Sequence, residues 1–479
     1  MNTQEKKPQI KRTLGTFSIV MMVVAATAPL TVVAGTQPLV MLYAQNNSIP
    51  VYYLATGIIL VLFSVGFTAM SKHVPNAGAF YSYIQAGLGR KMGMGAATMA
   101  LLSYTLICIA VMAYLGYSTS ATITLFFPQT NIPWYICALV WWAFIAYLGY
   151  HNIDMSSKVL GIFLVLEVAV VTIVDLAVVL KGGATGLDAA PFSPSNFLSG
   201  TPGMGLMWAF FGFIGYEATA VFRSEAKDPD RTIPRATYLA VAFIALFYGF
   251  SAWCLVMGAG SNNALAMADK TQDGYALAIA SAFVGRWLSD FIQCLLVTSL
   301  FACMLSLHNV AARYTYTLAD VKVLPAKLAE IHPKHYTPSN ASLVISLITF
   351  ILLAIVTFIG LDPLIIYAWF ANAATLGLLL LQCLTSVSVI VFFRRFRSSK
   401  SIWHTVIAPA VSTVALGFVT FIIVTNFSAL TGDMTSAITM GLLIPTSFAL
   451  GSFLAGRMEK KKPREYELLQ NLVSNTVQA

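Results

Sequence analysis

Charged side chains are scarce in this chain of 479 residues: Asp, Glu, Lys and Arg together make up 10% of it. Hydrophobic residues make up 58%, and the mean hydropathy is +0.77. A water-soluble globular protein does not need so much apolar surface. Apolar runs of about 20 residues, each able to cross the hydrocarbon core as a helix, recur from end to end. The sequence therefore predicts a polytopic membrane protein without a separate soluble domain.

Cysteine and histidine are also few, with six of each. The cysteines all fall inside apolar runs and never in CxxC spacing, which argues against disulfides and zinc sites. The scattered histidines form no catalytic or metal-binding cluster, and no channel filter motif repeats along the chain. We therefore expect neither an enzyme nor a channel, with no cofactor and no metal. A substrate sensor built on a transporter scaffold remains open.

Windows of about 20 apolar residues predict twelve membrane-spanning helices. They place a cytoplasmic tail at 1–13, a transmembrane domain at 14–456 and a second cytoplasmic tail at 457–479. Two outer loops, 181–202 and 260–278, are rich in Gly, Pro, Ser, Asn and Asp, so we expect irregular caps there. The expected spans are 14–44, 50–71, 94–127, 132–150, 156–180, 203–222, 236–260, 279–318, 341–360, 363–393, 402–427 and 434–456.

The basic residues agree with this count. With both termini in the cytoplasm, Lys181, Lys270 and Arg286 fall outside, which leaves 25 of the 28 Lys and Arg residues on cytoplasmic segments. A wrong number of helices would scramble that segregation. The net charge of +9 therefore indicates orientation in a membrane and not nucleic-acid binding. We expect a multi-pass protein of the inner membrane.

Two spans carry residues that interrupt a helix. In the first span Pro29 removes a backbone N–H and clashes with the carbonyl four residues earlier. In the sixth span Gly212 and Gly215 weaken the helix, and Glu217 follows within the apolar run. Prolines and glycines also serve helix packing in membranes. A pair of interruptions five spans apart, with a carboxylate beside the second, instead favours a solute site near the middle of the bilayer.

Three blocks of sequence resemble the amino acid–polyamine–organocation permeases. The first is FGFIGYE at 211–217 with EAKDPDRTIPR at 225–235, similar to the sixth helix of that family and its E-x-K-x-P-x-R-x-I-P-R exit loop. The second is PNAGAFYSY at 75–83, similar to P-x-A-G-x-x-Y-x-Y. The third consists of Asn309, Arg313, Tyr316, Leu324-Pro325 and Thr337-Pro338. The resemblance implies an all-α fold of two inverted five-helix repeats plus two C-terminal helices, with helices 1 and 6 broken.

The same resemblance implies a secondary active transporter of amino acids or related amines that works by alternating access. Glu217 would hold a substrate ammonium or tie the broken helix to its neighbour, and Phe211 or Tyr216 would form an aromatic gate. The expected substrate-binding residues are Ala26, Thr27, Ala28, Pro29, Leu30, Phe211, Gly212, Phe213, Gly215, Tyr216 and Glu217.

The first break departs from the family pattern. Where the family has a Gly-Ser-Gly-type turn whose N–H groups hold a substrate carboxylate, this chain has Ala26-Thr27-Ala28-Pro29. Proline donates no hydrogen bond, and alanine adopts fewer backbone conformations than glycine. An amine, a polyamine or a modified amino acid remains open as the substrate, as does exchange in place of import.

Further acidic and polar residues lie inside the apolar runs. Glu167 in the fifth span is the candidate for coupling to H⁺, although it could instead neutralise a cation or serve as a structural partner. We expect the protein to be a monomer or a homodimer. Asp175 is expected to reach the outer interface, Arg286 to pair with Asp290, and His308 to pack in the interior. Asn372 and Asn309 are candidates for hydrogen bonds across helices.

Overall fold

The structure is a computed structural model that describes residues 14–74, 79–151, 157–332, 338–396, 401–428 and 434–469. Throughout these residues the chain is helical, apart from turns, loops and one isolated bridge between Leu14 and Ala226. The all-α polytopic fold class is therefore confirmed. Within the described residues, ten helices are long and apolar enough to cross a membrane. They are the broken helix 1 at Thr16–Ala44, α4 (Ile49–Ser71), α6 (Arg90–Phe126), α8 (Ser157–Lys181), α12 (Pro229–Ala259), α15 (Arg286–Asp320), α16 (Ser339–Phe358), α17 (Pro363–Arg395), η6 (Trp403–Ile407) with α18 (Ala408–Thr425), and α20 (Met434–Lys461).

Two more expected spans are present as helices that fall outside this group of ten. One is α7 (Trp134–His151), in which polar-tipped aromatic side chains and a terminal histidine dilute the apolar residues. The other is broken helix 6, formed by α10 (Pro202–Phe211) and α11 (Ala218–Val221), each too short to span alone. Twelve spans thus remain a prediction, and ten meet the criteria of length and composition.

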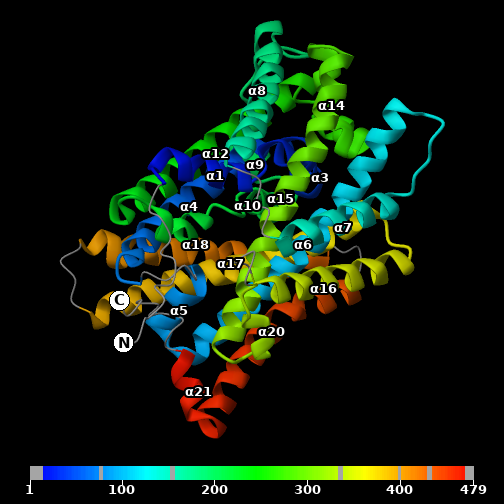
Figure 1. Cartoon of the computed structure of the whole chain (residues 1–479). Helices are drawn as coiled ribbons and strands as arrows, with labels where there is room; N and C mark the ends of the chain where they lie inside the picture. The colour runs from blue at the N-terminus through cyan, green and yellow to red at the C-terminus, as the bar shows by residue number, and fades with distance from the viewer. Residues whose placement is uncertain are drawn as a thin grey trace.

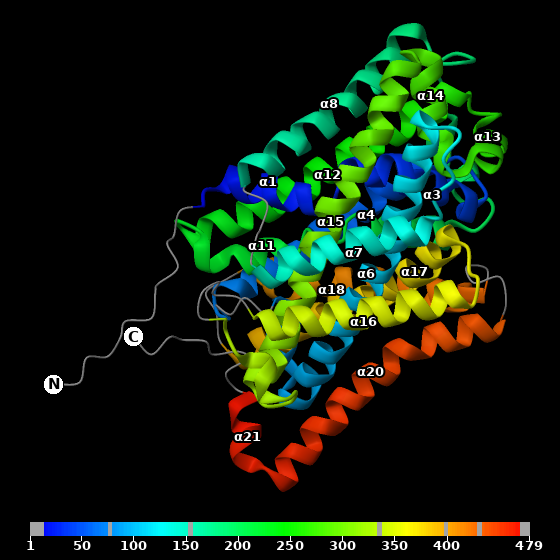
Figure 2. The same ribbon diagram turned by 45° about the vertical axis from the view of Figure 1, so that its right-hand side comes forward.

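Helices that lie five spans apart pack against each other. Span 2 (α4) packs along span 7 (α12), and span 3 (α6) packs along span 8 (α15). This is the arrangement expected when two five-helix repeats surround a common axis. The most central span is α6, with 83% of its apolar window buried, whereas 17% is buried in α20. In both views α8 and α20 lie on opposite sides of the bundle, with α4 and α6 between them (Figure 1, Figure 2).

The outer loops are more helical than their composition predicts. Residues 260–278, expected to be an irregular cap, contain α13 (Ala264–Thr271) and η4 (Gln272–Gly274). The alanines of α13 favour a helix, and Ala264 and Ala268 are buried where it packs on helix 1. The apolar run 279–318, expected to be one span, is divided into α14 (Tyr275–Phe283) and α15. Gly285, at φ +135°, lies between them in a conformation that favours glycine.

Shorter helices complete the described chain. They are α5 (Ala79–Leu88), η2 (Ala190–Phe192), α9 (Pro194–Phe197), η3 (Phe222–Glu225), η5 (Ala326–Ala329) and α21 (Pro463–Leu468). Because α20 continues to Lys461 and α21 follows, the helical part extends beyond residue 456, where we expected the tail to begin. Residues 75–78 and Thr337, which belong to two of the family-like blocks, lie outside the described residues.

Candidate functional site

Helix 1 breaks where the sequence predicts. Its first segment, α1 (Thr16–Ala26), ends before Thr27, whose hydroxyl donates to the Val24 carbonyl at 2.8 Å. Ala28 adopts a left-handed conformation (φ 48°, ψ 73°) that alanine rarely adopts. Pro29 then begins the short α2 (Pro29–Thr31), because proline suits the first position of a helix and cannot continue one. The π-helical turn η1 (Val32–Thr36) and α3 (Gln37–Ala44) complete the span.

Helix 6 also breaks where expected, between Phe211 and Ala218. The intervening residues form tight turns with bonds to the carbonyl three residues earlier, including Phe213 N–H to Phe210 at 3.0 Å. Gly215 lies at φ +111°, a conformation that an L side chain would strain.

The two breaks meet inside the molecule. A Cβ atom placed on Gly215 would lie 3.5 Å from the carbonyl carbon and oxygen of Ala26. Residues expected at the site are therefore brought together from opposite halves of the chain. Most of them are shielded from solvent, namely Thr27, Ala28, Pro29, Leu30, Gly212, Phe213, Tyr216 and Glu217.

The two candidate gate residues have different surroundings. Phe211 is partly exposed, and its ring lies 5.7 Å from those of Trp208 and Tyr367. Tyr216 is fully buried, its ring contacts Phe63 edge-on at 6.5 Å, and its hydroxyl has no hydrogen-bond partner among the described residues. Phe211 is therefore the more accessible of the two.

Glu167 lies directly at the first break. Its Oε2 atom accepts a hydrogen bond from the Leu30 backbone N–H at 3.2 Å, across 137 positions of sequence. Ser299 of α15 lies beside the same carboxylate, and its hydroxyl accepts from Thr31 at 3.1 Å. The carboxylate thus caps the start of α2, where backbone N–H groups lack partners within the helix.

Glu217 occupies the corresponding place at the second break. Its Oε1 atom accepts from the Tyr104 hydroxyl at 2.5 Å, and its Oε2 atom accepts from the Gly215 N–H at 3.0 Å. Because Tyr104 belongs to α6, this carboxylate ties the broken helix to its neighbour. That is the second of the two roles expected for Glu217. Tyr248 of α12 adds a further tie, since its hydroxyl reaches the Thr27 carbonyl at 3.4 Å.

Other polar residues give mixed outcomes. Arg286 and Asp290 approach to 3.9 Å as expected, and His308 packs inside with Nε2 2.9 Å from the Ser342 hydroxyl. The expectation for Asp175 was wrong. It is buried, because its face of α8 packs on α12, and its Oδ1 atom accepts from Ser251 at 3.2 Å. Asn372, a candidate for a bond across helices, has no side-chain hydrogen-bond partner among the described residues.

The position of the breaks can be compared with that of two cavities in the described part of the chain. One of about 20 Å³ borders Leu30, Val33 and Asp175 beside the first break. The larger, about 280 Å³, lies elsewhere, at the ends of α4 and α12, and is lined by residues that include Lys72, Arg235 and His404. It does not touch either break. Size alone therefore does not identify the candidate site.

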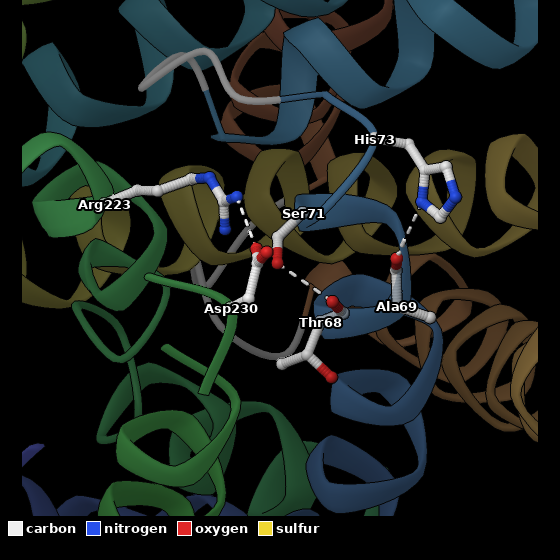
Figure 3. Close-up of polar contacts among 6 residues, drawn as sticks. All are labelled: Thr68, Ala69, Ser71, His73, Arg223 and Asp230. Carbon is white, nitrogen blue, oxygen red and sulfur yellow. Dashed lines mark hydrogen bonds and ion pairs between the residues drawn. The ribbon is translucent and has the colours of Figure 1, made fainter. Parts of the chain in front are cut away.

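The loop that follows helix 6 is fixed to its surroundings. Arg223 and Asp230 point toward each other near the end of α4 and form an ion pair at 2.7 Å (Figure 3). Lys227 donates its N–H to the Leu14 carbonyl at 3.0 Å. The segments after helix 6 and before helix 1 are therefore held together, which couples the two broken helices at this end.

Comparison with known proteins agrees with the geometry. The family model described as amino acid permease matches residues 18–462. The chain is 24% identical to the cationic amino acid transporter 7, chloroplastic, of Arabidopsis thaliana, over 85% of this chain and 75% of that protein. It is 22% identical to the branched-chain amino acid permease BcaP of Bacillus subtilis (86% and 88%). It is 23% identical to the low-affinity putrescine importer PlaP of Escherichia coli (69% and 72%).

Proposed function

Because this chain belongs to the amino acid permease family, we propose that it is a secondary transporter of amino acids or related amines. It works by alternating access, opening the site between the two broken helices to one side of the membrane at a time. Its relatives named above transport amino acids or putrescine, which supports this class of substrate without choosing within it.

The observation that carries the proposal is the contact between the two breaks. Ala26 and Gly215 lie against each other although 188 residues separate them along the chain. Interrupted helices in a bilayer need partners for their freed backbone groups, and a bound solute can supply some of them. A solute between the breaks would contact both halves of the chain, so that its binding can bias their relative position.

Glu167 is the first candidate for proton coupling. It is a buried carboxylate that bonds directly to the broken part of helix 1, so a change in its charge would act on that break. Phe211 is the proposed gate, and Glu217 joins helix 6 to α6.

We propose that the protein resides in the inner membrane with both termini in the cytoplasm, as the distribution of basic residues supports. An amine exchanger is the second candidate function, since the Ala-Thr-Ala-Pro turn departs from the usual carboxylate-binding turn. A sensor that binds substrate without moving it is the non-transporting alternative.

Uptake of radiolabelled amino acids and amines into proteoliposomes with a pH gradient tests the proposal. We expect saturable accumulation that depends on the gradient, and loss of that dependence in Glu167→Gln. Unchanged pH dependence in Glu167→Gln would refute its coupling role. Binding without any accumulation would favour the sensor.

A further inference from the structure

The backbone donors at the first break are already used within the protein. Thr27 N–H bonds to the Val23 carbonyl at 3.1 Å, and Ala28 N–H bonds to the Ala25 carbonyl at 3.1 Å. Pro29 has no N–H, and Leu30 N–H bonds to Glu167 at 3.2 Å. Each position from 27 to 30 therefore lacks a free donor for a substrate carboxylate.

The donors at the second break are used in the same way. The N–H groups of Gly212, Phe213, Ile214 and Tyr216 bond to carbonyls three or four residues earlier. That of Gly215 bonds to the Glu217 carboxylate at 3.0 Å. At each break, a carboxylate of the protein thus occupies the donor that a substrate carboxylate would need.

Unlike the backbone N–H groups, a backbone carbonyl at the first break is left without its helical partner. In an uninterrupted helix Leu30 N–H would bond to the Ala26 carbonyl, but here that N–H bonds to Glu167. The Ala26 carbonyl oxygen is thereby released, and it lies at the contact with Gly215 between the two breaks. A released carbonyl favours a donor or a cation.

The two buried carboxylates at the breaks also favour a cationic substrate. Glu167 and Glu217 are both buried, and neither forms an ion pair among the described residues. A buried carboxylate is costly without a counter-charge or extensive hydrogen bonding. A third carboxylate, brought by a substrate, would add repulsion, whereas a substrate cation would relieve it.

We propose that the substrate is an organic amine cation without a carboxylate, recognised by its ammonium group at the Ala26 carbonyl between Glu167 and Glu217. This inference rests on the transport function proposed above and narrows its substrate class. The two glutamates take the place of an amino acid's carboxylate at the Leu30 and Gly215 N–H groups.

Matched pairs of a natural amino acid and its decarboxylated amine give the test: arginine with agmatine, lysine with cadaverine, and ornithine with putrescine. Uptake into proteoliposomes and the thermal shift of the purified protein are measured for each pair at one pH. We expect the amine to exceed its amino acid by about tenfold or more in apparent affinity, as expected for one charged hydrogen-bonding group lost or repelled. Equal or stronger binding of the amino acids would overturn the inference.

The variant Glu167→Ala sharpens the test because it releases the Leu30 N–H and removes one charge. We expect its preference for the amine to fall severalfold, at a fixed pH and in both readouts. The control is Asp290→Asn, which removes a carboxylate that pairs with Arg286 at the start of α15 and bonds to neither break. Its preference should match the unmodified protein, and an equal fall in both variants would overturn the inference.

The failures of the two proposals are distinguishable. Preferential binding of the amines without any uptake would refute transport and support the substrate class. Uptake of amino acids in preference to amines would support transport and overturn the substrate class, as would the absence of any response to the amines.

Discussion

Individual acidic residues were recognisable in the sequence, but their partners were not. Glu167 and Glu217 stood out because carboxylates are costly inside apolar runs. Their bonds to Leu30 and Tyr104 depend on helix packing across more than 100 residues, which local patterns do not encode. Asp175 was misjudged for the same reason: its depth depends on the helix that packs against it.

The Tyr104–Glu217 hydrogen bond should contribute measurably to stability. Tyr104→Phe removes a buried donor to a carboxylate at 2.5 Å, and hydrogen bonds to charged groups are worth about 1.5–3 kcal/mol. We expect a loss of that size in the free energy of unfolding, measured in detergent with a chemical denaturant. The matched control is Tyr117→Phe, whose contact with Asp273 spans 3.4 Å. Equal losses in the two variants would contradict this assignment.

Asp273, in an outer loop, should make stability depend on pH. Burial, and more weakly the nearby Asp362 carboxylate, raises the pKa of Asp273 above its ordinary value. The folded state therefore binds this proton more tightly than the unfolded state does. Protonated Asp273 therefore stabilises the folded state at pH values below its ordinary pKa. This stabilisation is lost as the pH rises through the raised pKa of the folded state.

Asp273→Asn should remove this pH-dependent contribution to stability. Thermal unfolding of both proteins, measured at a series of pH values across the acidic range, tests this. We expect the variant to gain stability relative to the original protein as the pH approaches neutrality. A difference between the two proteins that does not change with pH would contradict the assignment.

At the scale of elements, the apolar runs predicted the long helices closely, because a bilayer restricts both length and composition. The two breaks were also predicted, from Pro29 and from the glycines of helix 6. The outer helix α13 was missed, since loop-like composition does not reveal a helix stabilised by packing on helix 1. The division of the eighth apolar run into α14 and α15 at Gly285 was also not predicted.

The conformation of Gly215 should be essential to the second break. Gly215→Ala places a side chain at φ +111°, which costs about 1–2 kcal/mol, and its Cβ would touch Ala26. We expect reduced stability together with reduced uptake.

The control is Gly417→Ala inside α18, where nothing lies within 4 Å of the added atom. It should stabilise the helix by about 0.5–1 kcal/mol. A Gly215→Ala protein as stable as Gly417→Ala would contradict this reading of the break.

At the scale of the whole molecule, the fold brings together two interruptions that the sequence places in different halves of the chain. The paired interruptions and the resemblance to permeases predicted that meeting. Composition predicted a membrane protein, and the distribution of basic residues predicted its orientation. The contact of Ala26 with Gly215, and the bonds that consume the backbone donors around it, required coordinates. Because those bonds occupy the N–H groups that would hold a substrate carboxylate, they favour an amine at this site.

The claim that a solute binds between the breaks is tested most directly by substrate protection of one cysteine. Thr27→Cys is prepared with the six native cysteines replaced by alanine, and its labelling by a membrane-permeant thiol reagent is timed with and without a transported amine. Lys270→Cys, on α13, is the control. We expect saturating amine to slow labelling at position 27 severalfold and to leave labelling at position 270 unchanged. Equal rates at position 27 with and without an amine that the same protein transports would contradict it.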